Sequence, residues 1–120
     1  MTIPGSLELA YIGDCVYDLY VRSRLITKGE KVRDMHLRAI KQVCAHAQSE
    51  ALKRIKDELT GEEAAVVKRA RNAHQTPPKN ASIAEYHMAT AIEALIGYLY
   101  LNGQVDRIDE LMNKALDGLD

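Results

Sequence analysis

Two acidic side chains fall in stretches of sequence whose other residues are mostly apolar and helix-forming. Asp14 lies in "YIGDCVYD" (11–18) and Glu93 lies in "TAIEALIGYLYL" (90–101). Asp14 is on what looks like the apolar side of its helix, so we expect it to be buried, and burying a carboxylate costs several kcal/mol unless something pairs with it. Each acid also has a glycine close by, Gly13 beside Asp14 and Gly97 one turn after Glu93. Glycine inside a helix costs about 1 kcal/mol relative to alanine but permits close approach, so we expect the two helices to cross there and the carboxylates to converge.

Converging carboxylates repel each other unless a proton or a cation lies between them. Asp18 follows Asp14 by one turn and could join the cluster, whereas none of the four histidines has zinc-like spacing. Ligation by oxygen alone is typical of a hard divalent cation such as Mg²⁺ or Mn²⁺. A lone acid can equally be a boundary residue that pairs with a backbone group or a basic side chain. Periodicity alone does not decide between these interpretations.

The elements that must position these acids are helices. Apolar residues recur at i, i+3, i+4 and i+7, and no sustained alternation indicates a strand. We predict an all-α fold that forms one domain over residues 1–120. The expected helices cover residues 6–26, 32–59 with a break, 61–73, 83–101 and 104–119.

Two turn signals separate the later helices. Thr60 and Ser82 each precede a glutamate by three residues, which is the capping-box spacing. The stretch "HQTPPKN" (74–80) must be a loop, because the second of two prolines disfavours the helical conformation of the first. We therefore expect helices to begin just after Thr60 and just after Ser82, with a rigid loop between them.

Composition bounds the class of protein. A chain of 120 residues with 47% hydrophobic content is long enough for one compact core. The longest strongly apolar stretch, residues 91–101, is too short to span a membrane, and residues 1–10 lack the features of an export signal. Two cysteines are too few for a disulfide framework, so we expect reduced thiols and a cytosolic location, with no membrane partner.

Charge is unevenly distributed. Residues 64–84 contain no acid and carry a charge of +4, which leaves the rest of the chain at −5 against a net charge of −1. A local basic segment on an acidic body favours a specific anionic partner, although such a segment can also be a solvated face. All six tyrosines fall in the two acid-bearing helices, and tyrosine is typical of clefts and subunit interfaces.

Two motifs carry a family resemblance. The stretch "LELAYIGDCVYDLYV" (7–21) resembles the signature helix of the ribonuclease III family, and "ATAIEALIGYLYLNG" (89–103) resembles its second acidic motif. Together with "RARNAHQTPPKNASIAEYHM" (69–88), the chain is similar to the short bacterial branch of that family, Mini-ribonuclease III, which lacks a double-stranded-RNA-binding domain.

The resemblance implies a homodimeric endonuclease that uses Mg²⁺, or Mn²⁺ as a substitute, to cleave double-stranded RNA. The suggested substrate is the precursor of large-subunit (23S) ribosomal RNA, with a ribosomal protein as a further possible partner on it. Asp14 and Glu93 match the family's catalytic, metal-binding carboxylates. Two other acidic positions of the family are Ala10 and Thr90 here, and each departure removes a charge.

The resemblance also extends to the two binding surfaces. For the RNA-binding surface it implies the basic segment and its loop: Lys68, Arg69, Arg71, Asn72, His74, Gln75, Lys79 and Asn80. A two-fold dimer would supply one hydrolytic centre for each strand of a duplex. For its interface we expect Tyr11, Tyr17 and Tyr20.

Two alternatives stay open. The first is a degenerate relative that keeps the fold but only binds structured RNA or ribosomal protein, which the residues at positions 10 and 90 favour and the intact Asp14 and Glu93 disfavour. The second is a helical regulator that binds duplex DNA through the basic segment, which is disfavoured because no helix-turn-helix signature accompanies it.

Overall fold

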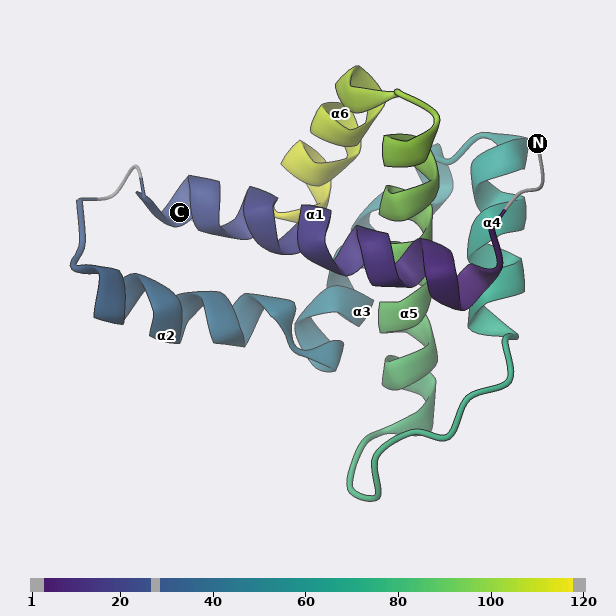
Figure 1. The fold of residues 1–120 in the computed structure, drawn as a ribbon, viewed down its shortest axis with the longest axis horizontal. Coiled ribbons are helices and arrows are strands. Elements are labelled where there is room, and N and C mark those ends of the chain that lie inside the picture. Colours follow the sequence, from purple (N-terminus) through teal and green to yellow (C-terminus); the bar gives the residue numbers. More distant parts are fainter. Residues whose placement is uncertain (1–3, 27–28, 118–120) are drawn as a thin grey trace.

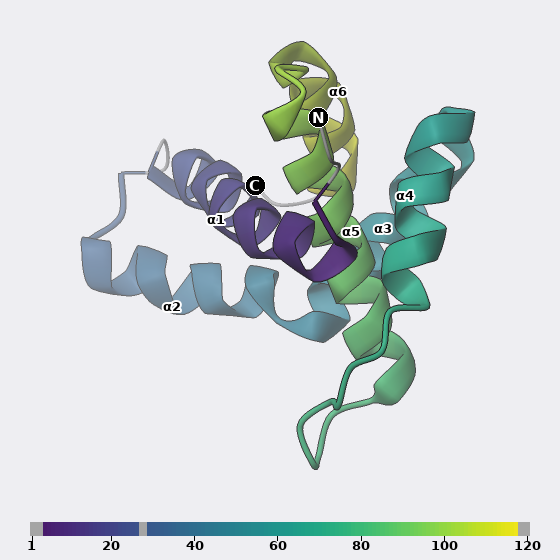
Figure 2. The same cartoon turned by 45° about the vertical axis from the view of Figure 1, so that its right-hand side comes forward.

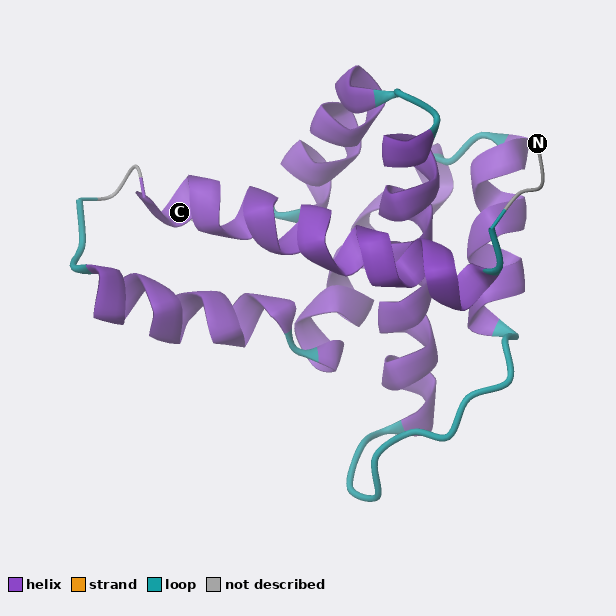
Figure 3. Ribbon diagram, in the orientation of Figure 1, coloured by secondary structure: helices purple, strands orange, loops and turns teal. Residues whose placement is uncertain are grey.

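The computed structural model describes residues 4–26 and 29–117, and all regular structure within them is helical (Figures 1 and 3). The elements in chain order are α1 (Ser6–Ile26), α2 (Val32–Val43), α3 (Ala45–Ile55), the 3₁₀ turn η1 (Lys56–Glu58), α4 (Gly61–Arg71), α5 (Ile83–Leu101) and α6 (Val105–Ala115). The predicted all-α class is therefore confirmed. The expected break in the second helical region falls at Cys44, whose extended backbone separates α2 from α3. The predicted end of the last helix, residues 118–119, lies outside the described residues.

The two predicted caps differ in completeness. At α4 the Thr60 hydroxyl accepts a hydrogen bond from the Glu63 amide (3.1 Å), and the Glu63 carboxylate accepts one from the Thr60 amide (2.9 Å). This is a full capping box. At α5 the Ser82 hydroxyl accepts a bond from the Glu85 amide, but the Glu85 carboxylate pairs with His46 of α3 instead. The reciprocal half of that box is replaced by a tertiary contact.

Helix α5 is the centre of the molecule. Its packing partners are α1, α3, α4 and α6, and Figures 1 and 2 show α1 crossing in front of it. Ile92, Leu95 and Ile96 are fully buried. A helix that is apolar around its whole circumference is stable only when neighbours surround it. Nevertheless, no helix in the described part of the chain is both long and apolar enough to cross a membrane.

The crossing of α1 and α5 depends on glycine. A Cβ atom at Gly13 would lie 1.6 Å from the Glu93 carbonyl oxygen, and one at Gly97 would lie 1.9 Å from the Leu9 carbonyl oxygen. Both positions therefore exclude any side chain. The predicted close approach at Gly13 and Gly97 is confirmed, and it fixes the position of Asp14 relative to the Glu93 turn.

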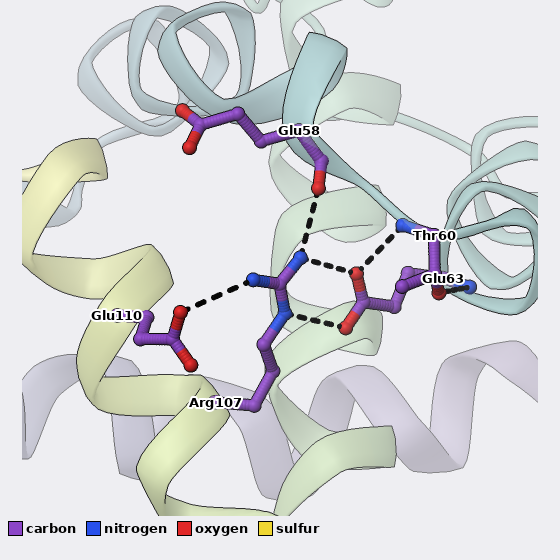
Figure 4. Close-up of polar contacts among 5 residues, drawn as sticks. All are labelled: Glu58, Thr60, Glu63, Arg107 and Glu110. Carbon is purple, nitrogen blue, oxygen red and sulfur yellow. Dashed lines mark hydrogen bonds and ion pairs between the residues drawn. The ribbon is translucent and has the colours of Figure 1, made fainter.

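An ion-pair network joins α4 to α6 (Figure 4). Arg107 donates two hydrogen bonds of 2.9 Å to the Glu63 carboxylate and one of 2.8 Å to the Glu58 carbonyl oxygen. The Glu63 side chain is 4% exposed and also completes the cap at Thr60. Arg107 further approaches Glu110 at 3.6 Å. Because the buried Glu63 carboxylate is paired and hydrogen-bonded, the network links α4 to α6, and loss of Arg107 would leave an uncompensated buried charge.

Candidate active site

The Asp14 and Glu93 side chains lie together beside the glycine crossing, close enough for Asp14 to raise the pKa of Glu93. Asp14 comes from α1 and Glu93 from α5. Both line a pocket of about 440 Å³ whose other walls come from α3 and from the loop between α4 and α5. The convergence expected from the two neighbouring glycines is therefore present.

The environment of Glu93 disfavours its ionised form. Burial raises the pKa of Glu93 to about 8, and the hydrogen bond and negative charge of Asp14 act in the same direction. The Gln48 side-chain amide donates to Glu93 Oε2 at 3.3 Å and opposes this rise in the pKa. A raised pKa favours the protonated form of Glu93 near neutral pH, which reduces the repulsion between the two side chains.

Asp14 itself is exposed, so the expectation that it is buried is wrong. The physical reason is its neighbour. Gly13 occupies the point where α1 touches α5, and the next residue is rotated by about 100° around the helix. Asp14 therefore lies at the edge of the contact and faces the pocket, while the half-buried member of the pair is Glu93.

Neutral side chains surround the acid pair. Ala10 and Thr90 both line the pocket, and the Thr90 hydroxyl donates to the Tyr86 carbonyl oxygen at 3.1 Å. Asp18 forms an ion pair with Arg22 at 3.0 Å and lines an adjacent pocket, which also includes Asp14.

The donor set is therefore two carboxylates. Within residues 4–26 and 29–117, no group of three or more His, Cys, Asp or Glu side chains could hold a metal ion. The acid pair nevertheless fits Mg²⁺, which binds through one or two carboxylates and keeps several waters.

The basic segment is at the surface, as an anion-binding role requires. Lys68, Arg69 and Arg71 are exposed on the second half of α4. The loop that follows projects from the helical body (Figure 2), and the residues of the predicted RNA surface that are exposed on it are Asn72, His74, Lys79 and Asn80. Gln75 is half-buried and lines the pocket of the acid pair. It is the residue of the predicted RNA surface that the structure brings into that pocket.

The three tyrosines expected at a subunit interface have different positions. Tyr17 is 1% exposed inside the core, so its assignment to an interface is wrong. Tyr20 is half-buried and donates a hydrogen bond to Asp109 of α6, which uses its hydroxyl within the chain. Tyr11 is 77% exposed and remains available to a partner.

Sequence reasoning missed Gln48. Its side chain is 3% exposed and contacts Glu93 from α3. The signal was present in the sequence, because Gln48, Leu52 and Ile55 occupy one helical stripe at i, i+4 and i+7, and all three are buried. A polar residue at a core position requires a partner.

Comparison with known proteins agrees with this architecture. Residues 7–104 match the family model described as the Ribonuclease III domain. The chain is 44% identical to a Mini-ribonuclease 3 of Symbiobacterium thermophilum over 98% of this chain and 91% of that protein. It is 47% identical to a Mini-ribonuclease 3 of Brevibacillus brevis, over 94% and 86% of the two chains. A crystal structure of a protein from Fusobacterium nucleatum has a TM-score of 0.87 at 32% identity and covers 95% of this chain and 94% of its own.

Proposed function

Because the chain belongs to the Mini-ribonuclease III branch of the ribonuclease III family, we propose that it is a divalent-metal-dependent endoribonuclease that cleaves double-stranded RNA. The observation that carries the proposal is the convergence of Asp14 and Glu93 in one pocket, beside a loop that continues the basic segment. We place its activity in a single catalytic domain and in the cytosol.

Asp14 and Glu93 are the residues that would hold Mg²⁺, or Mn²⁺ in its place. Such an ion supplies an activated water and relieves the charge that develops on the leaving oxygen of a phosphodiester. Asp14 is exposed and can meet the substrate backbone, whereas half-buried Glu93 anchors the site to the rigid α5 core. On this assignment the role of both side chains is to hold and orient, and neither acts as a nucleophile.

The basic segment positions the substrate. Lys68, Arg69, Arg71 and Lys79 supply four cationic side chains with no acid between residues 64 and 84. Double-stranded RNA is recognised through its shape, its phosphates and its 2′-hydroxyl groups, for which cations and neutral hydrogen-bonding groups are suited. Asn72, His74 and Asn80 are exposed for such contacts, and Gln75 extends the surface into the pocket.

The working unit in this proposal is a homodimer. One acid pair per chain gives one hydrolytic centre, and a two-fold axis matches the antiparallel strands of a duplex. Tyr11 lies beside exposed Leu7 and Leu101 at a shallow apolar depression on α1 and the end of α5. Exposed apolar side chains grouped in this way are typical of an interface. We place the isologous contact there.

Ribosomal RNA is the proposed substrate class, specifically the precursor of large-subunit (23S) RNA, with a ribosomal protein on the substrate as a further partner. The alternative is a protein that only binds structured RNA, which the neutral residues Ala10 and Thr90 in the pocket favour. Cleavage separates the two functions.

The test is an incubation of the pure protein with long duplex RNA and with duplex DNA, each with Mg²⁺ and with chelator. The proposal predicts cleavage of duplex RNA only, and only with Mg²⁺. Binding of RNA without cleavage in Mg²⁺ or in Mn²⁺ would favour the degenerate alternative. Preferential binding of duplex DNA would indicate a different class of protein.

A further inference from the structure

We propose that Gln48 is a positioning residue for the metal-binding carboxylates, holding the Glu93 side chain toward Asp14 through its amide group. This inference rests on the proposed function of the acid pair and adds a residue from a third helix. Gln48 lies on α3, which packs against α5 and, like α1, contributes a wall of the pocket that holds the acid pair.

The geometry gives Gln48 a defined partner. Gln48 is 3% exposed, and its Nε2 donates to Glu93 Oε2 at 3.3 Å. Gln48 belongs to the buried stripe of α3 that also contains Leu52 and Ile55. A donor fixed by core packing is suited to holding a carboxylate in one orientation.

The acid pair needs such a donor. To take up a cation, both Asp14 and Glu93 must be ionised, and until the ion lies between them the two like charges repel each other. Without a second hydrogen-bond partner, the flexible Glu93 side chain can turn away from Asp14. The Gln48 amide holds the Glu93 carboxylate in its orientation from α3. The carboxylate is then already oriented before the ion binds.

A neutral donor fits this role better than a charged one. A lysine or arginine in the place of Gln48 would put a positive charge next to the ion and weaken its binding by repulsion. An amide supplies an N–H group without a net charge. A glutamine at position 48 is therefore suited to a site that binds a metal ion. A purely structural contact with a glutamate would favour a positively charged side chain, as in the pairing of Arg107 with Glu63.

The test uses Gln48→Met, which keeps the length of the side chain and removes the donor, and Gln48→Asn, which keeps the amide but shortens its reach. Gln42→Met is the matched control, because Gln42 lies on α2 and lines neither the pocket of the acid pair nor the adjacent one. Three properties are measured for each: the Mn²⁺ affinity without RNA by calorimetry, the affinity for duplex RNA in chelator, and kcat and KM across a Mg²⁺ titration. Circular dichroism checks that each variant is folded.

Both Gln48 variants should bind Mn²⁺ about 10-fold more weakly, in the range expected when the partner of a metal ligand is removed. Their kcat should fall at low Mg²⁺ and recover at high Mg²⁺, with the KM for RNA and the metal-free RNA affinity unchanged. Gln42→Met should behave like the wild type. If Gln48→Met fails to fold, Gln48→Asn alone decides the matter.

Wild-type Mn²⁺ affinity in the folded Gln48 variants would overturn this inference, as would an equal loss in Gln42→Met. Glu93→Gln in the same titration keeps the two proposals distinguishable. If Glu93→Gln loses Mn²⁺ binding while the Gln48 variants do not, only the role of Gln48 fails. If Glu93→Gln binds Mn²⁺ like the wild type, the metal site itself is wrong.

Discussion

Gly13 and Gly97 lie against each other where α1 crosses α5. A Cβ atom on Gly13 would lie 2.9 Å from the Gly97 amide nitrogen, and one on Gly97 would lie 3.0 Å from the Gly13 amide nitrogen. The two backbones are therefore in direct contact. Asp14 follows Gly13 and Glu93 lies one turn before Gly97, so this contact brings the two acids together. The position of the acid pair therefore depends on the backbone packing.

Gly13→Ala should destabilise the fold and separate the acid pair. The added methyl group would overlap the Glu93 carbonyl oxygen, so α1 and α5 must move apart, at a cost of about 3 kcal/mol. Urea denaturation measures the loss of stability, and Mn²⁺ calorimetry on the remaining folded protein measures the loss of the site. Gly61→Ala is the control, since nothing lies within 4 Å of a Cβ there. Equal stability of the two variants would contradict the role of the crossing.

Much of the fold could be predicted from local pattern. The bounds of α1, the cap at Thr60 and the loop at residues 74–80 all follow from periodicity, capping spacing and proline sterics, and the structure has them where expected. The crossing at the two glycines could also be predicted from the sequence, because glycine inside a helix lowers helix stability and close packing of two helices explains its presence. These features depend on short stretches of chain.

The side-chain environments could not be predicted in the same way. The exposure of Asp14 depends on which part of α1 touches α5, and the burial of Tyr17 depends on the helices that cover it. The pairing of Glu85 with His46 and of Gln48 with Glu93 joins residues far apart in the sequence. Each of these exposures and pairings depends on tertiary packing. A single sequence gives no distances between residues that are far apart in the chain.

Replacing Arg69, Arg71 and Lys79 with alanine should weaken binding to any duplex RNA. Each lost phosphate contact should reduce the slope of log affinity against log salt by roughly 0.9, the calibration for B-form DNA. Filter binding in chelator at several salt concentrations measures the slope. Alanine at Lys53, Lys56 and Lys114 removes the same charge from α3, η1 and α6 and should leave it unchanged. The same slope in both triple variants would make residues 64–84 a solvated face.

The Glu63–Arg107 pair should make stability depend on pH in the acid range. Hydrogen bonds from Arg107 hold the pKa of Glu63 below its ordinary value of 4.5. A lowered pKa in the folded state means that the contribution is present above pH 4.5 and is lost as the pH falls through the folded value. Glu63→Gln should cost about 2 kcal/mol at pH 7 and should lose less stability than the wild type between pH 6 and pH 3.

Urea denaturation across that pH range measures the effect. Glu62→Gln is the matched control, because Glu62 is the exposed neighbour on the same turn of α4. It should follow the wild-type pH dependence. If Glu63→Gln follows it as well, the ion pair does not contribute to acid stability in the way proposed.

Tyr11→Glu should convert the proposed dimer to a monomer. The change places a charge in the apolar depression beside Leu7 and Leu101, where burial against a second copy would leave it unpaired. Sedimentation velocity measures the mass. Leu37→Glu, which changes an exposed apolar residue of α2, should remain dimeric. A wild-type protein that sediments as a fully active monomer would refute the dimer outright.

Asp14 and Glu93 form the proposed hydrolytic centre, and single-turnover cleavage of duplex RNA at saturating Mg²⁺ measures what each of them contributes. Asp14→Asn and Glu93→Gln should each reduce cleavage to background, while the folded state and the RNA affinity in chelator are unchanged. Asp18→Asn should retain most of the activity, because Asp18 pairs with Arg22 and not with Glu93. Near-normal cleavage by either Asp14→Asn or Glu93→Gln would show that these two residues do not form the hydrolytic centre.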